Sequence, residues 1–99
     1  MLFHVEMIVN LPPGIEEVFA EGLKARERAR SQELQREGKW RHIWRLAGVY
    51  ANVSIFDVAD PQELHDIMIG LPLFPYMTVT VRALCHHPSA LADATQRSA

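Results

Sequence analysis

The chain has 99 residues, of which 48% are hydrophobic and 22% charged, and its formal net charge is −2. This composition is typical of one globular domain and excludes a wholly disordered chain. No apolar run approaches the ~20 residues of a membrane span, and no basic region followed by a long apolar stretch opens the chain, so we expect neither a membrane partner nor a signal peptide. The single cysteine, Cys85, cannot form an internal disulfide. A reduced, cytoplasmic setting is therefore expected.

The charged residues are mixed rather than gathered into a basic patch. Eight of the ten Lys and Arg residues lie between Lys24 and Arg45, and the same stretch holds Glu27, Glu33 and Glu37. Interspersed charges of both signs are typical of a solvated helix face. The sequence therefore predicts no nucleic-acid partner.

Hydrophobic periodicity predicts six elements. Residues 2–9 alternate like a half-buried strand, which the prolines and glycine of residues 10–14 end. Apolar residues at a spacing of three and four, among them Val18 and Phe19, then predict one long helix over 15–37. The remaining predicted elements are strands over 40–46 and 49–58, a short helix over 61–69 that Asp60, Pro61 and Glu63 can cap, and a strand over 76–84.

The order β-α-β-β-α-β predicts an α+β, ferredoxin-like sandwich with a four-stranded antiparallel sheet. We expect a single domain over residues 1–88 and a polar C-terminal tail over 89–99. Helices on one face of such a sheet leave the other face bare, and a bare aliphatic face is typical of a protein interface. We therefore expect the chain to dimerise sheet to sheet. The residues expected on this face are Phe3, Val5, Met7, Val9, Val49, Ala51, Val53, Ile55, Met77, Val79 and Val81.

Glu27 and Lys24, both on the long predicted helix, are candidates for chemistry. Glu27 comes one turn after Leu23, on the edge of the apolar stripe. Partial burial disfavours the charged form of a carboxylate and raises its basicity, which suits proton abstraction. Lys24 could bind an anionic substrate or tune Glu27. The alternative is that Glu27 is a surface residue paired with Arg30 or Lys24, and that Lys24 is simply solvated.

Tyr50 and Asn52 are two residues apart on a predicted strand, so their side chains should share one face of the sheet. A hydroxyl and an amide side by side could hold a carbonyl oxygen as it gains negative charge. They could equally form a polar pair that satisfies itself. His4 could donate a hydrogen bond or bind a carboxylate, although a histidine near a strand start often has a structural role.

The sequence predicts no metal site, because its five histidines and one cysteine do not fall at zinc-ligand spacing. The larger aromatic residues are most simply core or interface residues, although any of them could wall a pocket. They include Trp40, Trp44, Phe74 and Tyr76.

Segments across residues 1–88 resemble the muconolactone Δ-isomerase family in order and spacing. Two of them, Trp40-Arg41-His42-Ile43-Trp44-Arg45 and Leu71-Pro72-Leu73-Phe74-Pro75-Tyr76-Met77, are specific when taken together. The others are Met1-Leu2-Phe3-His4-Val5, Leu23-Lys24-x-x-Glu27, Tyr50-Ala51-Asn52, Phe56-Asp57-Val58, Leu64-His65-Asp66 and His87-Pro88.

The resemblance implies a cofactor-free enzyme, an intramolecular oxidoreductase that transposes a C=C bond. It would convert muconolactone to 3-oxoadipate enol-lactone in the catechol branch of the 3-oxoadipate pathway of aromatic catabolism. The resemblance also implies a ferredoxin-like fold and a homo-oligomer built of dimers, commonly a decamer. On the positions it supports, we assign Glu27 to proton transfer, Tyr50 and Asn52 to the enolate, and Lys24 or His4 to the carboxylate of the substrate.

Three other functions stay open at this point. A related branch of the family removes chloride from 5-chloromuconolactone and would use much of the same site; the histidine at position 4 favours the isomerase. A small cofactor-free monooxygenase on the same fold would consume oxygen. A ligand-binding module would bind without turnover.

Overall fold

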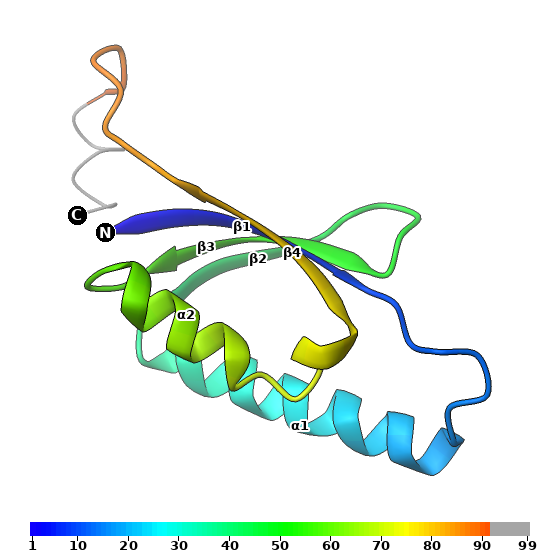
Figure 1. Ribbon diagram of the computed structural model, residues 1–99. Coiled ribbons are helices and arrows are strands. Elements are labelled where there is room, and N and C mark those ends of the chain that lie inside the picture. Colours follow the sequence, from blue (N-terminus) through cyan, green and yellow to red (C-terminus); the bar gives the residue numbers. More distant parts are fainter. Residues whose placement is uncertain (92–99) are drawn as a thin grey trace.

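The computed structural model describes residues 1–91, and it has the predicted order of strands and helices (Figure 1). The predicted tail over 89–99 lies mostly outside this range. The elements are β1 (Leu2–Val9), α1 (Glu17–Arg36), β2 (Trp40–Arg45), β3 (Ala51–Asp57), α2 (Pro61–Ile69), the 3-10 helix η1 (Phe74–Tyr76) and β4 (Met77–Ala83). The four strands form one antiparallel sheet in the order β2-β3-β1-β4, so the ferredoxin-like prediction is confirmed.

Both helices lie on the same face of the sheet (Figure 1), and the hydrophobic core fills the space between the two layers. β1 runs through the middle of the sheet, and its alternate residues are buried. Val5, Met7, Leu34 and Phe56 are fully buried there. The core therefore depends on the pleat of β1, which points every second side chain at the helices.

Strand register corrects the predicted aliphatic face. Phe3 pairs with Phe56 and Val5 with Ser54, and directly paired residues of antiparallel strands point to the same side of the sheet. Val53 and Ile55 therefore point away from the helices, opposite to the buried side chains of β1. The apolar sides of the predicted strands do not join into one face, because the helix-facing side of β3 is the one that carries Ser54. The expectation that the apolar residues of β1 and β4 line the uncovered face was wrong, because this side of both strands faces the helices: Phe3, Val5, Met7, Val9, Met77, Val79 and Val81.

The face that the helices leave uncovered is mixed in polarity. Register places Glu6 beside Val53 and Thr80, and it places Trp44 on the other side of Val53. The apolar residues of this face are Ile8, Trp44, Ala51, Val53 and Ile55, and the polar ones include His4, Glu6, His42, Thr78, Thr80 and Arg82.

α1 starts two residues later than predicted, because Glu16 acts as its N-cap. The Glu16 carboxylate accepts hydrogen bonds from the backbone N–H groups of Val18 and Phe19 at 3.1 and 3.0 Å. Val18 and Phe19 are 77% and 49% exposed, so they do not belong to the buried stripe that the periodicity predicted. This end of α1 extends beyond the sheet (Figure 1), where no strand can cover it.

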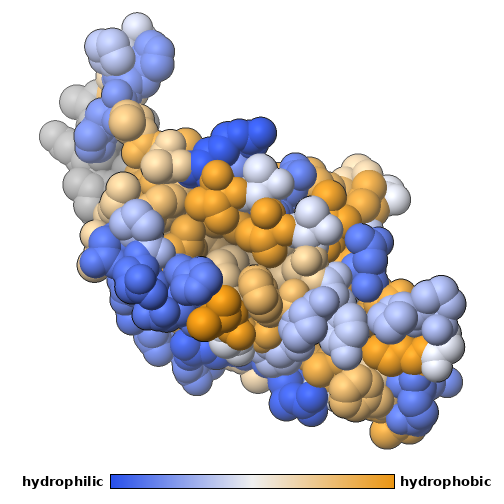
Figure 2. Space-filling model, viewed as in Figure 1, coloured by the Kyte–Doolittle hydropathy of each residue, from blue (hydrophilic) through white to orange (hydrophobic). Residues whose placement is uncertain are grey.

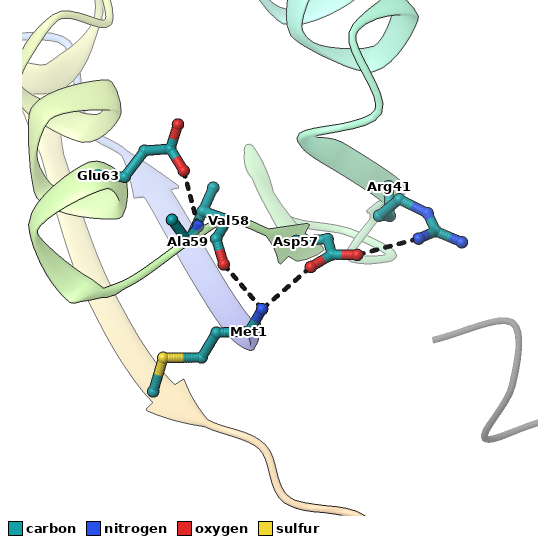
Figure 3. A network of polar contacts seen from close by, with 6 residues as sticks. All are labelled: Met1, Arg41, Asp57, Val58, Ala59 and Glu63. Atoms are coloured by element: carbon teal, nitrogen blue, oxygen red, sulfur yellow. Dashed lines mark hydrogen bonds and ion pairs between the residues drawn. The ribbon is translucent and has the colours of Figure 1, made fainter. Parts of the chain in front are cut away.

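A polar network joins the start of β1 to the end of β3 (Figure 3). The Met1 ammonium donates to the Val58 carbonyl at 2.7 Å and lies 3.2 Å from an Asp57 carboxylate oxygen. The other oxygen of Asp57 accepts a hydrogen bond from Arg41 of β2 at 3.2 Å. The network therefore ties together the ends of three neighbouring strands.

The turn before β4 contains η1, which the sequence did not predict. Its hydrogen bonds, Phe74 N–H to Leu71 O and Tyr76 N–H to Leu73 O, are both 2.9 Å long. Figure 2 shows hydrophobic surface gathered near α2 and β4, where a mainly apolar cavity lies between Leu64, Met68 and Val79. In the part of the chain that the structure describes, no helix is long and apolar enough to span a membrane.

Candidate active site

A second cavity, of about 190 Å³, lies between α1 and the helix-facing side of the sheet. From α1 it is lined by Lys24, Glu27, Arg28 and Ser31, which follow one another at i, i+3, i+4 and i+7. This spacing places four polar side chains on one face of the helix. The opposite wall consists of Trp40, Ile43 and Arg45 of β2, Asn52 of β3, and Tyr50, which directly precedes β3. The structure thus brings together four of the five predicted site residues.

Glu27 is half-buried and lines this cavity. Its Oε1 accepts a hydrogen bond from the backbone N–H of Leu73 at 3.0 Å. Burial raises the pKa of the Glu27 carboxyl, and the Leu73 hydrogen bond opposes that rise only in part. A carboxylate that is held in place by one oxygen and made more basic by burial is suited to accept a proton with the other.

The alternative ion pairs of Glu27 do not form in the described residues. Lys24 lies 3.5 Å from Glu21, and Arg30 pairs with Glu33. The contact to Leu73 takes their place, across 46 residues of sequence. Glu27 is therefore not a solvated surface residue.

Asn52 has a fixed orientation in the cavity wall. Its Oδ1 accepts a hydrogen bond from the hydroxyl of the fully buried Ser54 at 2.7 Å. An amide whose oxygen is engaged in this way has its NH₂ group left to donate. The expectation that Tyr50 and Asn52 share a face is confirmed, since both line the cavity.

Two cations lie beside the ring of Tyr50. The Nζ of Lys24 is 5.6 Å from the ring centroid, and the Cζ of Arg45 is 5.1 Å from it. Arg45 also donates a hydrogen bond from Nη1 to the Ala51 carbonyl at 3.3 Å. The distances of 5.6 and 5.1 Å to the ring centroid of Tyr50 both lie within the range of cation–π attraction. This end of the cavity is therefore positively charged and suited to bind a carboxylate.

His4 is the predicted site residue that does not join this cavity. Its neighbours Phe3 and Val5 are buried against the helices, so the alternation of β1 directs His4 to the uncovered face. Its Nδ1 is buried there and has no hydrogen-bond partner among the described residues. Within one chain, His4 cannot join Lys24 in holding a ligand in this cavity.

The sequence reasoning missed Arg28, Ser31 and Arg45. The i, i+4 and i+7 spacing from Lys24 could have indicated the first two, because it continues the helix face that carries Glu27. The pairing of β2 with β3 places Arg45 directly beside Asn52. The register of that hairpin is therefore the feature that indicates Arg45.

The described residues contain no group of three or more His, Cys, Asp or Glu side chains that could hold a metal ion. The titratable groups of the cavity are instead one carboxylate, three cations and a tyrosine. Such a set can move a proton and stabilise an oxyanion.

Known proteins resemble this chain over nearly its whole length. Residues 1–90 match the family described as Muconolactone delta-isomerase. Muconolactone Delta-isomerase 2 of Acinetobacter lwoffii is 60% identical over 93 residues, covering 94% of this chain and 97% of the relative. Muconolactone Delta-isomerase of Pseudomonas aeruginosa is 54% identical over 91 residues, covering 92% and 95%.

A crystal structure of muconolactone isomerase superimposes with a TM-score of 0.88 at 55% sequence identity, covering 92% of this chain and 95% of that one. The agreement includes the sequence, the length and the fold. It therefore follows that the chain belongs to the muconolactone Δ-isomerase family.

Proposed function

We propose that this chain is a cofactor-independent isomerase that converts muconolactone to 3-oxoadipate enol-lactone, in the catechol branch of the 3-oxoadipate pathway. Family membership supports this reaction class. The observation that carries the proposal is Glu27, whose half-buried carboxylate has a raised pKa and lies between hydrogen-bond donors and cations. This is the arrangement that a proton transfer through an enolate requires.

The reaction needs one base and an oxyanion site. The ring C–H at the γ position of muconolactone is acidified through the C=C bond by the lactone carbonyl. When Glu27 takes this proton, the electron pair moves through the double bond and the carbonyl oxygen becomes an enolate oxygen. The protonated Glu27 then returns the proton to the α carbon, two ring positions away, and the double bond ends in its new place. One carboxylate performs both steps if the transfer stays on one face of the ring.

The other cavity residues divide the remaining tasks. We assign Tyr50 and Asn52 to donate hydrogen bonds to the enolate oxygen, since the Asn52 amide is oriented by Ser54 with its NH₂ group free. We assign Lys24 to the side-chain carboxylate of the substrate. We assign Arg45 to the same carboxylate, in place of His4, because Arg45 and Lys24 both lie beside Tyr50.

The proposal is tested by mixing the purified protein with muconolactone and following the product spectrum. We expect turnover without any added cofactor, and we expect it to persist after exhaustive treatment with a metal chelator. The reason is that every proton-transfer role is filled by a side chain of the cavity. Loss of turnover on chelation, with recovery on addition of one metal, would contradict this prediction.

The same mixture with 5-chloromuconolactone separates the isomerase from the dehalogenase. Removal of the same ring proton followed by loss of chloride would release a free anion that an ion-selective electrode detects. Chloride release that is faster than isomerisation of muconolactone would assign the chain to dehalogenation.

We infer that the chain assembles into a homo-oligomer built of dimers, with a decamer as the expected size, and that it works in the cytoplasm. The support for assembly is the uncovered face of the sheet, where Trp44 is 55% exposed and lies beside Val53. An apolar strip across the middle of an open sheet gains free energy when a second copy covers it. The support for the cytoplasm is Cys85, which is a free, exposed thiol.

Val53→Asp is expected to break this assembly. Val53 lies in the centre of the uncovered face, between Glu6 and Trp44, so the new carboxylate would be buried without a partner at the interface. Sedimentation velocity should show the variant at a smaller size, and thermal unfolding should show a lower Tm. Val53→Thr, which keeps the shape without the charge, is the control. A wild-type protein that sediments as a stable, folded monomer at micromolar concentration would contradict the inference.

A further inference from the structure

Arg28 lines the cavity of the candidate active site but has no task in the proposed reaction. The other two cations of the cavity have contacts of their own: Lys24 lies 3.5 Å from Glu21, and Arg45 donates a hydrogen bond to the Ala51 carbonyl at 3.3 Å. The guanidinium of Arg28 forms no ion pair, hydrogen bond or ring contact within residues 1–91. An arginine that lines a cavity with all its donors unused is suited to bind an anion.

The sequence supplies no counter-charge on the face of α1 that carries Arg28. The residues one turn away from it are Lys24, Ala25, Ser31 and Gln32. Lys24 and Arg28 are therefore like charges at i and i+4, a spacing that is unfavourable on a helix. The adjacent Glu27 points about 100° away around the helix axis, and its carboxylate accepts the hydrogen bond of Leu73. The fold thus keeps two cations together against their mutual repulsion, which a bound anion would offset.

The cavity has more positive charge than one carboxylate of a substrate can balance. Three cations and one carboxylate line it, which leaves two positive charges when Glu27 is ionised. Muconolactone carries a single carboxylate, because its second carboxyl group is closed into the ring. Lys24 and Arg45 bind that carboxylate in the proposed function, so the substrate offers no charge to Arg28. A ligand with two carboxylates would match the charge of the cavity.

The positions of the cations indicate how far apart two such carboxylates lie. Arg28 and Arg45 are exposed and mark the mouth of the cavity, whereas Lys24 and Glu27 are half-buried. Arg28 lies one turn after Lys24, about 6 Å farther along α1. An extended chain of six carbons with a carboxylate at each end spans a comparable distance. The lactone contains the same number of carbons, so an open-chain dicarboxylate of this size suits the same cavity.

We propose that Arg28 completes a dicarboxylate site, in which one carboxylate of an open-chain, six-carbon ligand lies between Lys24 and Arg45 and the other pairs with Arg28 at the mouth. This inference rests on the proposed function, which supplies the position of the first carboxylate, and adds a class of inhibitor to it. The ligand takes the place of the lactone and therefore inhibits competitively. Hydrolysis of the lactone ring of the substrate or the product gives a dicarboxylate of this kind, so ring-opened product that accumulates would slow the isomerase.

Isothermal titration calorimetry with adipate and hexanoate tests the proposal without turnover. The two probes have the same six-carbon chain and differ in one carboxylate. We expect the wild type to bind adipate about 5-fold more tightly than hexanoate, as for a favourable ion pair at an exposed position. Arg28→Gln should remove this preference. Arg26→Gln, the same change of charge at an exposed residue of α1 that does not line the cavity, should keep it. Equal affinity for the two probes, no binding of adipate, or a preference that survives in Arg28→Gln would overturn the proposal.

Inhibition kinetics tests whether adipate takes the place of the lactone. Adipate should raise the KM for muconolactone without changing kcat, and its Ki should rise about 5-fold in Arg28→Gln but not in Arg26→Gln. The KM for muconolactone should change less than this in Arg28→Gln, because the lactone has no second carboxylate. Inhibition that lowers kcat and leaves KM unchanged would place adipate outside the cavity and overturn the proposal. A wild-type protein without turnover would instead contradict the proposed function, and the calorimetric comparison would still decide the role of Arg28.

Discussion

Replacing Glu27 with Gln is expected to lower kcat for muconolactone by about 10²–10⁴-fold, the range typical of a lost general base. The amide keeps the size of the side chain and can still accept the Leu73 hydrogen bond, but it cannot take up a proton at neutral pH. Substrate binding should change much less, because the carboxylate acts on the reacting carbon rather than on the charged group of the substrate. The measurement is kcat and KM of folded variants with unchanged assembly.

Glu33→Gln is the matched control for this experiment. Glu33 lies on the same helix and pairs with Arg30 at the surface, outside the cavity. Its substitution should leave kcat unchanged because Glu33 does not line the cavity. The fold should also be unaffected, since exposed ion pairs contribute little to stability. If Glu27→Gln keeps more than about a tenth of the wild-type kcat, the base lies elsewhere. Glu6, the next candidate on sequence grounds, lies on the opposite face of the sheet and could not replace it within one chain.

The pH dependence follows from the same residue. The free enzyme must have Glu27 ionised, so kcat/KM should rise with pH as this carboxyl loses its proton. Burial raises the pKa of Glu27, and the midpoint of the rise should therefore lie above the ordinary value for a glutamate. A pH profile measured at constant ionic strength should show this limb in the wild type and in Glu33→Gln. The limb should be absent from the residual activity of Glu27→Gln.

Replacing Asn52 with Ala is expected to lower kcat by an amount on the order of 10–10³-fold. The amide is held by Ser54 with its NH₂ group left to donate, and this pre-set orientation is what an oxyanion donor needs. The loss should be smaller than for Glu27, because Tyr50 remains as a donor to the enolate. Steady-state kinetics on folded protein gives the comparison.

Two further variants make the Asn52 experiment decisive. Asn52→Asp has nearly the same shape but brings a negative charge towards the enolate, so its kcat should fall below that of Asn52→Ala. Gln62→Ala removes an amide of the same kind from the exposed face of α2, where it donates to Asp66 at 2.9 Å. It should leave kcat unchanged. An Asn52→Ala variant as active as Gln62→Ala would show that Asn52 has no part in stabilising the enolate.

The sequence alone determined those features that depend on one element at a time. The alternation of β1 predicted that Phe3, Val5, Met7 and Val9 share one side of the strand, because a strand directs successive residues to opposite faces. It did not predict that this side packs on the helices. The same period placed Tyr50 and Asn52 on one side of the strand predicted over 49–58, and both line the cavity. The position of Glu27 at the edge of an apolar helix stripe indicated partial burial and a more basic carboxylate, but it left a surface ion pair open as the alternative.

The tertiary structure decided how the elements face one another. Each strand has an apolar side, but only register shows that Val53 lies opposite to Val5 in the sheet, because β3 turns Ser54 towards the helices. Only the packing of Leu73, directly before η1, beside Leu23 of α1 brings the Leu73 N–H to Glu27, across 46 residues that no periodicity connects. The position of Arg45 in the cavity and of His4 outside it have the same cause. Alternation along a strand shows which side chains share a face of the sheet, but only the packing of the two layers decides which face the helices cover.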